Sequence, residues 1–108
     1  MVIELLKVTC PSEKHAAFIQ RDGDVWTRGL MRHPGFVGKE VWTNPDNPAQ
    51  VILVIHWESM AQWRSFPREW RDELDAKMGD LLLPFTCETY DVVMPDIRPF
   101  LARQPGGD

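Results

Sequence analysis

The segment from Trp26 to Trp42 joins a helix-like pattern to a strand-like pattern through the pair Pro34-Gly35. Proline cannot continue a helix and glycine tolerates the backbone that ends one, so this pair predicts an abrupt stop. Apolar residues before the pair recur at helical spacing, while the residues at 38–43 favour a strand. A helix that feeds a strand so directly implies a domain in which helices pack on a sheet.

Six elements are predicted along the chain, in the order strand, helix, strand, strand, helix, strand. The strands are expected at 2–8, 38–43, 51–57 and 86–93, and the helices at 13–33 and 61–78. Ser59 and Gln62 have the spacing of a capping box before the second helix, which Pro67 is expected to bend or interrupt and Gly79 to end. The polar, proline-rich segment 44–50 is predicted to be a turn.

The predicted strand 51–57 is apolar on both of its alternating faces. One face carries Val51, Leu53, Ile55 and Trp57, and the other carries Ile52 and Val54 with His56. One face of an antiparallel sheet is usually in water, so two apolar faces indicate that each is covered. The element order is that of a ferredoxin-like α+β fold, a βαββαβ four-stranded antiparallel sheet with both helices on one side. The sequence therefore predicts a homodimer in which a second copy covers the other side and the two sheets form a dimeric α/β barrel.

The 108 residues suffice for one domain, expected at 1–94, followed by a C-terminal tail at 95–108. The net charge of −4 argues against a nucleic-acid partner, which calls for clustered Lys and Arg. No apolar run approaches the ~20 residues that span a bilayer and no signal segment is evident, so a cytoplasmic protein without a membrane partner is expected. Cys10 and Cys87 lack the spacing of a metal or redox motif, and no metal site is predicted.

Three runs of residues, Val2 to Lys7, Pro34 to Trp42 and Trp57 to Ser59, carry a family resemblance. Together they resemble the antibiotic biosynthesis monooxygenase-like group of the dimeric α/β barrel superfamily, over nearly all of 1–93. That group includes cofactor-independent oxygenases of polycyclic phenols and quinols, haem-degrading enzymes and many proteins without known activity. A shared fold does not choose among these functions, so the resemblance leaves the activity open.

The resemblance also implies a test for haem. Haem-degrading members carry an Asn late in the first strand, and a Trp and an iron-ligating His on the second helix. An ungapped comparison from Trp57 puts Phe66 and Ala76 at the two helix positions, and the first strand offers Lys7 in place of the Asn. No His follows His56, so the second helix cannot supply the ligand, and no haem or other cofactor is expected.

His56 is the one ionisable residue in the apolar strand 51–57, and a neutral imidazole there is a candidate general base. Strand parity predicts that Glu4 and Glu40 share its face. The resembling oxygenases draw electrons from the substrate itself, so these three residues are candidates for removing a phenol proton without a metal. The alternative is that they satisfy one another in a polar patch inside the dimer barrel.

Five aromatic residues are predicted to contact a flat apolar ligand: Trp26, Trp42, Trp57, Trp63 and Phe66. Aromatic residues at helical spacing are also typical of an ordinary packed core. The predicted function is a cofactor-independent monooxygenase of a small aromatic phenol or quinol, and the alternative is a non-catalytic small-molecule-binding or structural dimer module. A purely structural dimer predicts a pocket filled by its own Trp rings.

Overall fold

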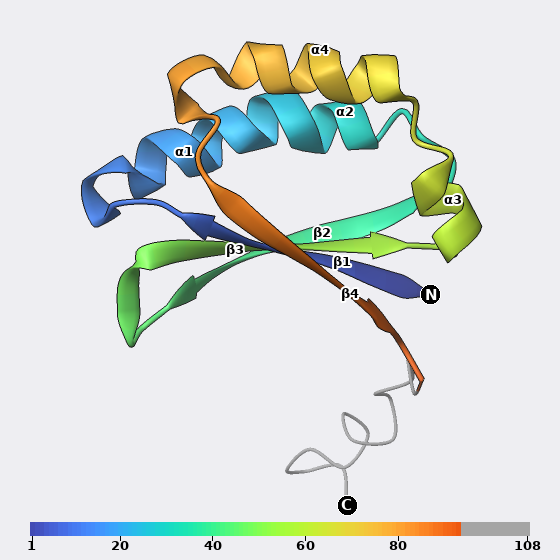
Figure 1. Cartoon of the computed structure of the whole chain (residues 1–108), viewed down its shortest axis with the longest axis horizontal. Coiled ribbons are helices and arrows are strands. Elements are labelled where there is room, and N and C mark those ends of the chain that lie inside the picture. The colour runs from blue at the N-terminus through green and yellow to red at the C-terminus, as the bar shows by residue number, and fades with distance from the viewer. Residues whose placement is uncertain (94–108) are drawn as a thin grey trace, which may run out of the picture.

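The computed structural model describes residues 1–93 as a four-stranded sheet with helices packed on one face (Figure 1). The strands are β1 (Val2–Thr9), β2 (Phe36–Asn44), β3 (Asn47–Trp57) and β4 (Phe85–Asp91). Their order in the sheet is β2-β3-β1-β4, and every neighbouring pair is antiparallel. This confirms the predicted ferredoxin-like α+β fold, with a sheet that is open in the single chain. The predicted tail at 95–108 lies outside the described residues.

The first helical region changes its winding midway. It comprises η1 (Ser12–Lys14), α1 (His15–Asp22), η2 (Gly23–Thr27) and α2 (Arg28–Leu30). The segment η2 is a π-helix, a widened turn that rotates the residues after it relative to those before it. The predicted helix 13–33 is therefore present but irregular, and periodicity alone did not reveal the widened turn.

The second helical region comprises α3 (Met60–Arg64), α4 (Arg68–Met78) and the short η3 (Gly79–Leu81). The side-chain oxygen of Ser59 accepts a hydrogen bond from the Gln62 backbone N–H at 3.1 Å, which caps α3. Pro67 has an extended backbone and separates α3 from α4, while Gly79 ends α4 with a φ of 59°. The predicted cap, break and stop are all confirmed.

The turn between β2 and β3 is shorter than the predicted 44–50, because β3 begins at Asn47 and takes in Pro48. The register of the two strands shifts between Thr43 and Asn44, so Pro48 has no pairing partner on β2. A proline is tolerated at such an irregularity because the sheet does not require its missing N–H. Since Asn44 also belongs to β2, the turn prediction is wrong at both ends of that segment.

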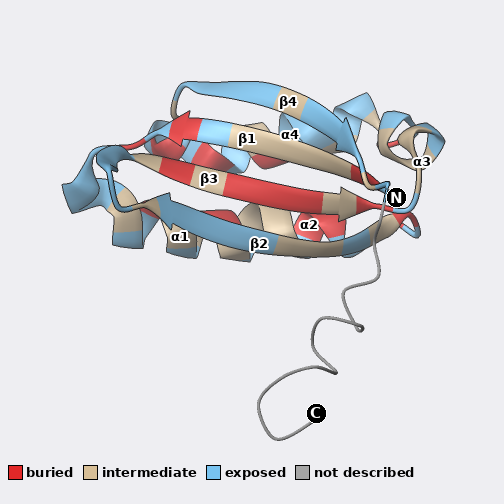
Figure 2. Cartoon of the chain, turned by 90° about the horizontal axis from the view of Figure 1, so that it is seen from below, coloured by how far each residue is buried: buried red, intermediate tan, exposed pale blue. Residues whose placement is uncertain are grey.

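The two faces of the sheet differ in what covers them. The face beneath the helices carries Val51, Leu53, Ile55 and Trp57, none more than 5% exposed. Within residues 1–93 no helix covers the opposite face (Figure 2). Val54 alternates onto that open face and is still only 3% exposed, because its strand neighbours surround it. The central strand is thus apolar on both faces, as predicted.

The predicted grouping of Glu4 with His56 is wrong. Residues directly opposite each other in an antiparallel pair point to the same side of the sheet. In the observed register Glu4 lies opposite Ile55, whereas His56 lies opposite Ile3. Even-numbered residues of β1 therefore match odd-numbered residues of β3, and Glu4 faces the helices while His56 faces away from them.

Candidate functional site

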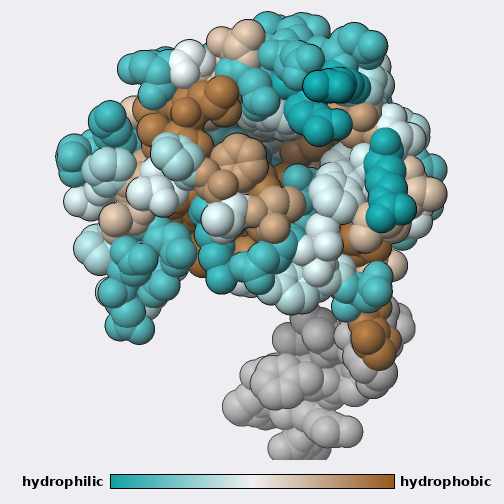
Figure 3. Space-filling model, in the orientation of Figure 1, coloured by the Kyte–Doolittle hydropathy of each residue, from teal (hydrophilic) through white to brown (hydrophobic). Residues whose placement is uncertain are grey.

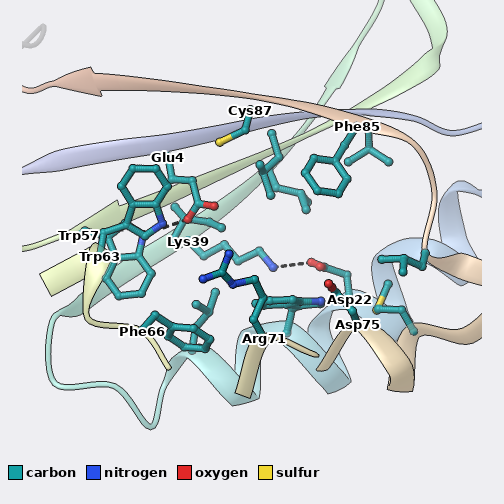
Figure 4. Close-up of a pocket in the computed structure, with 18 of the residues that line it drawn as sticks. Glu4, Asp22, Lys39, Trp57, Trp63, Phe66, Arg71, Asp75, Phe85 and Cys87 are labelled. Carbon is teal, nitrogen blue, oxygen red and sulfur yellow. Dashed lines mark hydrogen bonds and ion pairs between the residues drawn. The ribbon is translucent and has the colours of Figure 1, made fainter. Parts of the chain in front are cut away.

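A cavity of about 680 Å³ lies between the helices and the helix-covered face of the sheet (Figure 4). Its apolar wall includes Leu6, Leu53, Ile55 and Trp57 from the sheet, and Trp26, Trp63 and Phe66 from the helical side. Its charged lining residues are Glu4, Asp22, Lys39, Arg64, Arg71 and Asp75. Ligand pockets typically have this size and this mixture of apolar walls with a few polar groups. The cavity is therefore not filled by its own Trp rings, as a purely structural dimer would require.

Apolar side chains also gather at the surface below the helices, on the side where β4 crosses the sheet (Figure 3). Leu82 and Phe85, just before and at the start of β4, are 47% and 53% exposed and also line the cavity. These two side chains link the cavity to the molecular surface. The cavity therefore has an apolar rim through which a flat ligand can enter.

Close packing of the two helical regions fixes the roof of the cavity. A Cβ atom built on Gly29 of α2 would lie 2.5 Å from Cδ1 of Leu74 on α4, so any side chain there would require Leu74 to shift. Glycine at this position lets the two helices meet around Leu74, which is buried. Of the two helix glycines, Gly23 has open space around its Cα and shows no such requirement.

Glu4 is the carboxylate at the sheet side of the cavity. The indole N–H of Trp57 donates a hydrogen bond to Oε1 of Glu4 at 3.1 Å (Figure 4). Burial raises the pKa of Glu4, and the Trp57 bond and the positive charges of Arg71 and Lys39 only partly oppose that rise. A carboxylate in this state is a stronger base than one in water, which suits it to accept a proton from a bound ligand.

A buried ion pair forms the floor of the cavity next to Glu4. Nζ of Lys39 bonds the carboxylate of Asp22, and both side chains are at most 4% exposed. The same Nζ lies 3.1 Å from the hydroxyl oxygen of Thr27. The pair ties β2 to the end of α1 and to the π-helical turn, so it holds the helical layer on the sheet.

Sequence reasoning missed this ion pair. In the sequence Lys39 stands next to Glu40, a neighbour of opposite charge. Consecutive strand residues point to opposite faces, and Lys39 lies opposite Ile55, on the helix-covered side. No local pattern connects Lys39 with Asp22, which is 17 positions earlier, so only the tertiary fold reveals their contact.

Arg71 and Asp75 enter the cavity from α4, one helical turn apart. Figure 4 shows the Arg71 side chain reaching into the cavity from the helix. Burial raises the pKa of Asp75, with a further rise from the charge of Asp72, while the nearby indole of Trp26 and the charge of Arg71 oppose it. Among residues 1–93 neither Arg71 nor Arg64, the other lining arginine, takes part in an ion pair, so both are open cations of the site, and Arg71 is the one whose charge acts on Glu4 and Asp75.

Four of the five predicted aromatic residues lie at the cavity, namely Trp26, Trp57, Trp63 and Phe66. Phe66 stacks with Trp26 at 6.1 Å between ring centroids and meets Trp57 edge-on at 6.1 Å. Trp42 does not join them, because it lies opposite Ile52 on the open face. There it is 44% exposed and donates its indole N–H to Glu40 at 3.3 Å. The prediction that Trp42 shares a ligand site with the other four is wrong.

His56 and Glu40 lie together but outside the cavity. Nε2 of His56 is 3.0 Å from Oε2 of Glu40, and this bond is the main cause that lowers the pKa of Glu40. Neither residue lines the cavity, because the sheet itself separates them from it. The sequence predicted His56 as the base for the ligand. His56 cannot have that role for a ligand held between the helices and the sheet.

The cavity lacks a histidine of the kind that ligates iron in the resembling haem-degrading enzymes. All three histidines of the sequence, His15, His33 and His56, lie outside its lining, so it offers no imidazole to an iron. In the described part of the chain no group of three or more His, Cys, Asp or Glu is placed to hold a metal ion. Likewise, none of the helices within 1–93 is both long and apolar enough to cross a membrane.

The fold and this cavity define an α+β protein of ferredoxin-like topology with a cavity between helices and sheet. The sequence profile of the antibiotic biosynthesis monooxygenase family matches residues 1–74. The chain belongs to this family, as the resemblance in its sequence predicted. No curated protein matches the chain in sequence.

Solved structures of low sequence identity share the fold. A mutant of MhuD with two manganese protoporphyrin IX molecules per active site is 16% identical, with a TM-score of 0.73, and the match covers 89% of this chain and 98% of that one. SnoaB, a cofactor-independent oxygenase from Streptomyces nogalater, is 17% identical, with a TM-score of 0.63 and coverage of 88% and 97%. A conserved protein from Methanosarcina mazei is 13% identical, with a TM-score of 0.61 and coverage of 83% and 91%. At these identities the likeness concerns the fold alone.

Proposed function

We propose that this protein is a cofactor-independent monooxygenase of a small aromatic phenol or quinol, which it holds in the cavity between helices and sheet. The observation that carries the proposal is Glu4, a carboxylate of raised pKa bonded to an indole inside an aromatic-walled cavity. Family membership and the similarity to SnoaB support the same reaction class.

In the proposed reaction Glu4 accepts the proton of a phenolic or enolic hydroxyl. The nearby charges of Lys39 and Arg71 stabilise the resulting anion, and the Trp57 bond keeps the carboxylate oriented. The electron-rich anion then reduces O2. For a tricyclic anthrone, the ring CH2 loses both hydrogens and gains one oxygen atom as a carbonyl, while the other oxygen atom leaves as water. The substrate supplies all the electrons, so no external reductant enters the balance.

The test is oxygen uptake with 1,8-dihydroxyanthrone, corrected for its spontaneous oxidation. Glu4→Gln keeps an acceptor for the Trp57 indole but removes the base, so we expect the rate to fall by about 100-fold. The matched control is Glu69→Gln, since Glu69 is exposed on α4 and does not line the cavity. Uptake that persists unchanged in Glu4→Gln contradicts the proposed role of Glu4.

The second candidate function is a binding module that holds an apolar aromatic compound without converting it. The size and aromatic walls of the cavity favour it as well, because they need no chemistry. It predicts saturable binding of 1,8-dihydroxyanthrone under air, with recovery of the unchanged compound and no enzyme-dependent oxygen uptake. That result would replace the oxygenase proposal.

We also propose that the functional unit is a homodimer joined through the open sheet faces. Ile52 and Val54 lie at the centre of that face, and Trp42 and Tyr90 are 44% and 49% exposed on it. A second copy would shield these apolar groups from water. Sedimentation equilibrium is expected to give twice the chain mass, and Ile52→Lys to give a folded monomer. A wild-type monomer at high concentration contradicts this part of the proposal.

A further inference from the structure

Two arginines line the cavity, Arg64 and Arg71, and it is the charge of Arg71 that acts on both Glu4 and Asp75. Arg21 donates to the Met78 carbonyl at 2.9 Å, and Arg32 stacks on the Trp70 ring at 4.7 Å from its centroid. Arg71 instead extends from α4 into the cavity (Figure 4), and within residues 1–93 its guanidinium forms neither an ion pair nor a side-chain hydrogen bond. A guanidinium presents a rigid fork of N–H donors that matches a planar carboxylate.

The cationic side chains around the cavity, which include Arg64 as well as Arg71, leave room for a further anion. Asp22 is already neutralised by Lys39 in the buried pair. The other two lining carboxyls, Glu4 and Asp75, both have a raised pKa because burial disfavours their charged form. Arg71 remains charged at any physiological pH and attracts both carboxyls without bonding either. A ligand that brings its own negative charge would complete this balance.

The aromatic walls indicate that the rest of the ligand is an aromatic ring. Trp57, Trp63 and Phe66 lie at the end of the cavity where Glu4 is located, as Figure 4 shows. An aromatic ring packed against them can direct a hydroxyl to Glu4 and a second substituent to the Arg71 side chain. The two polar contacts lie on different layers, Glu4 on the sheet and Arg71 on the helices, so they fix the orientation of the ring between them.

We propose that the cavity selects aromatic hydroxy acids, with Arg71 binding the ligand carboxylate while the ring hydroxyl faces Glu4. The role of the ring hydroxyl rests on the proposed function. The contact between Arg71 and the ligand carboxylate concerns binding alone and can be tested without the reaction. Arg71 is thus assigned as a specificity-determining residue rather than as the base.

The test compares 1-hydroxy-2-naphthoic acid with its neutral methyl ester by isothermal titration calorimetry without oxygen. The wild-type protein is expected to bind the acid about tenfold more tightly than the ester, at the low end for a charge-assisted bond because Arg71 is exposed. Arg71→Gln is expected to bring the two affinities within about twofold of each other. Arg68→Gln, an exposed arginine of the same helix outside the cavity lining, should keep the wild-type preference.

Circular dichroism melting checks that each variant is folded, and Arg71→Lys, which keeps the charge but not the planar fork, should show a reduced preference for the acid. The inference is overturned if the wild-type protein binds the ester as tightly as the acid, if it binds neither at millimolar concentration, or if the preference survives in Arg71→Gln. Preference for the acid without oxygen uptake on any substrate supports the Arg71 contact and overturns the oxygenase proposal. Oxygen uptake without that preference supports the oxygenase proposal and overturns the Arg71 contact.

Discussion

Glu4 and Glu40 each accept a hydrogen bond from a tryptophan indole, but they lie on opposite faces of one sheet. On the helix-covered face burial dominates and raises the pKa of Glu4 despite its bond from Trp57. On the open face the bond from His56 dominates and lowers the pKa of Glu40. The same carboxylate–indole contact therefore gives a proton acceptor on one face and an ordinary charged group on the other. The difference arises because the helical layer buries Glu4 and leaves Glu40 in water.

The largest expected difference between the faces concerns their ion pairs. Lys39→Met leaves the Asp22 carboxylate buried without a partner and should lower the free energy of unfolding by about 3–5 kcal/mol. Lys7→Met removes the exposed pair with Glu88 on the open face and should leave the urea midpoint unchanged. An equal loss of stability in the two variants would show that the ion pair of the covered face contributes no more than that of the open face.

The indole donors should differ in the same direction. Trp57→Phe removes a buried ring edge and the bond to Glu4, at an expected cost of about 2 kcal/mol in urea unfolding. Trp42→Phe removes the corresponding bond to Glu40 from an exposed ring and should change stability by less than about 0.5 kcal/mol. A Trp42 variant as damaged as the Trp57 variant contradicts the comparison.

Packing of the covering layer is open to a smaller test. Gly29→Ala places a methyl group against Leu74, and we expect a loss of about 1 kcal/mol, since the Leu74 side chain can shift to relieve part of the overlap. Gly23→Ala meets open space in a helical backbone and should be neutral or slightly stabilising. Thermal melting of both variants provides the measurement. A destabilised Gly23→Ala would indicate a requirement of the π-helical turn.

The fold was largely predictable from sequence because its signals are local. Residues that favour strands marked the four strands, Ser59 marked a helix start, and Pro67 and Gly79 marked a break and an end. These residues act on their own backbone, so their effect does not depend on distant contacts.

The site was less predictable because it depends on how distant elements are placed. Parity fixes which residues of one strand share a face, but the register between β1 and β3 decides whether Glu4 joins His56 or Ile55. The long connection between these strands leaves that register unset by any turn. The contact of Lys39 with Asp22 likewise requires the helical layer to be docked on the sheet.

The smallest expected effect is a pH dependence of opposite sign on the two faces. The folded-state pKa of Glu4 is raised, so the folded protein binds more protons than the unfolded chain and loses stability as the pH rises through that pKa. Glu4→Gln should therefore gain in melting temperature relative to wild type between acid and neutral pH. The folded-state pKa of Glu40 is lowered, so its contribution is present at neutral pH and lost on acidification, and Glu40→Gln should show the reverse trend.

The most direct test is a carbon-13 NMR titration of the glutamate side-chain carboxyls, assigned with the Glu4→Gln and Glu40→Gln variants. We predict that the Glu4 carboxyl titrates above the usual glutamate range and that the Glu40 carboxyl titrates below it. If both carboxyls titrate together, or if Glu4 titrates below Glu40, the covered face does not create a proton acceptor and the proposed role of Glu4 fails.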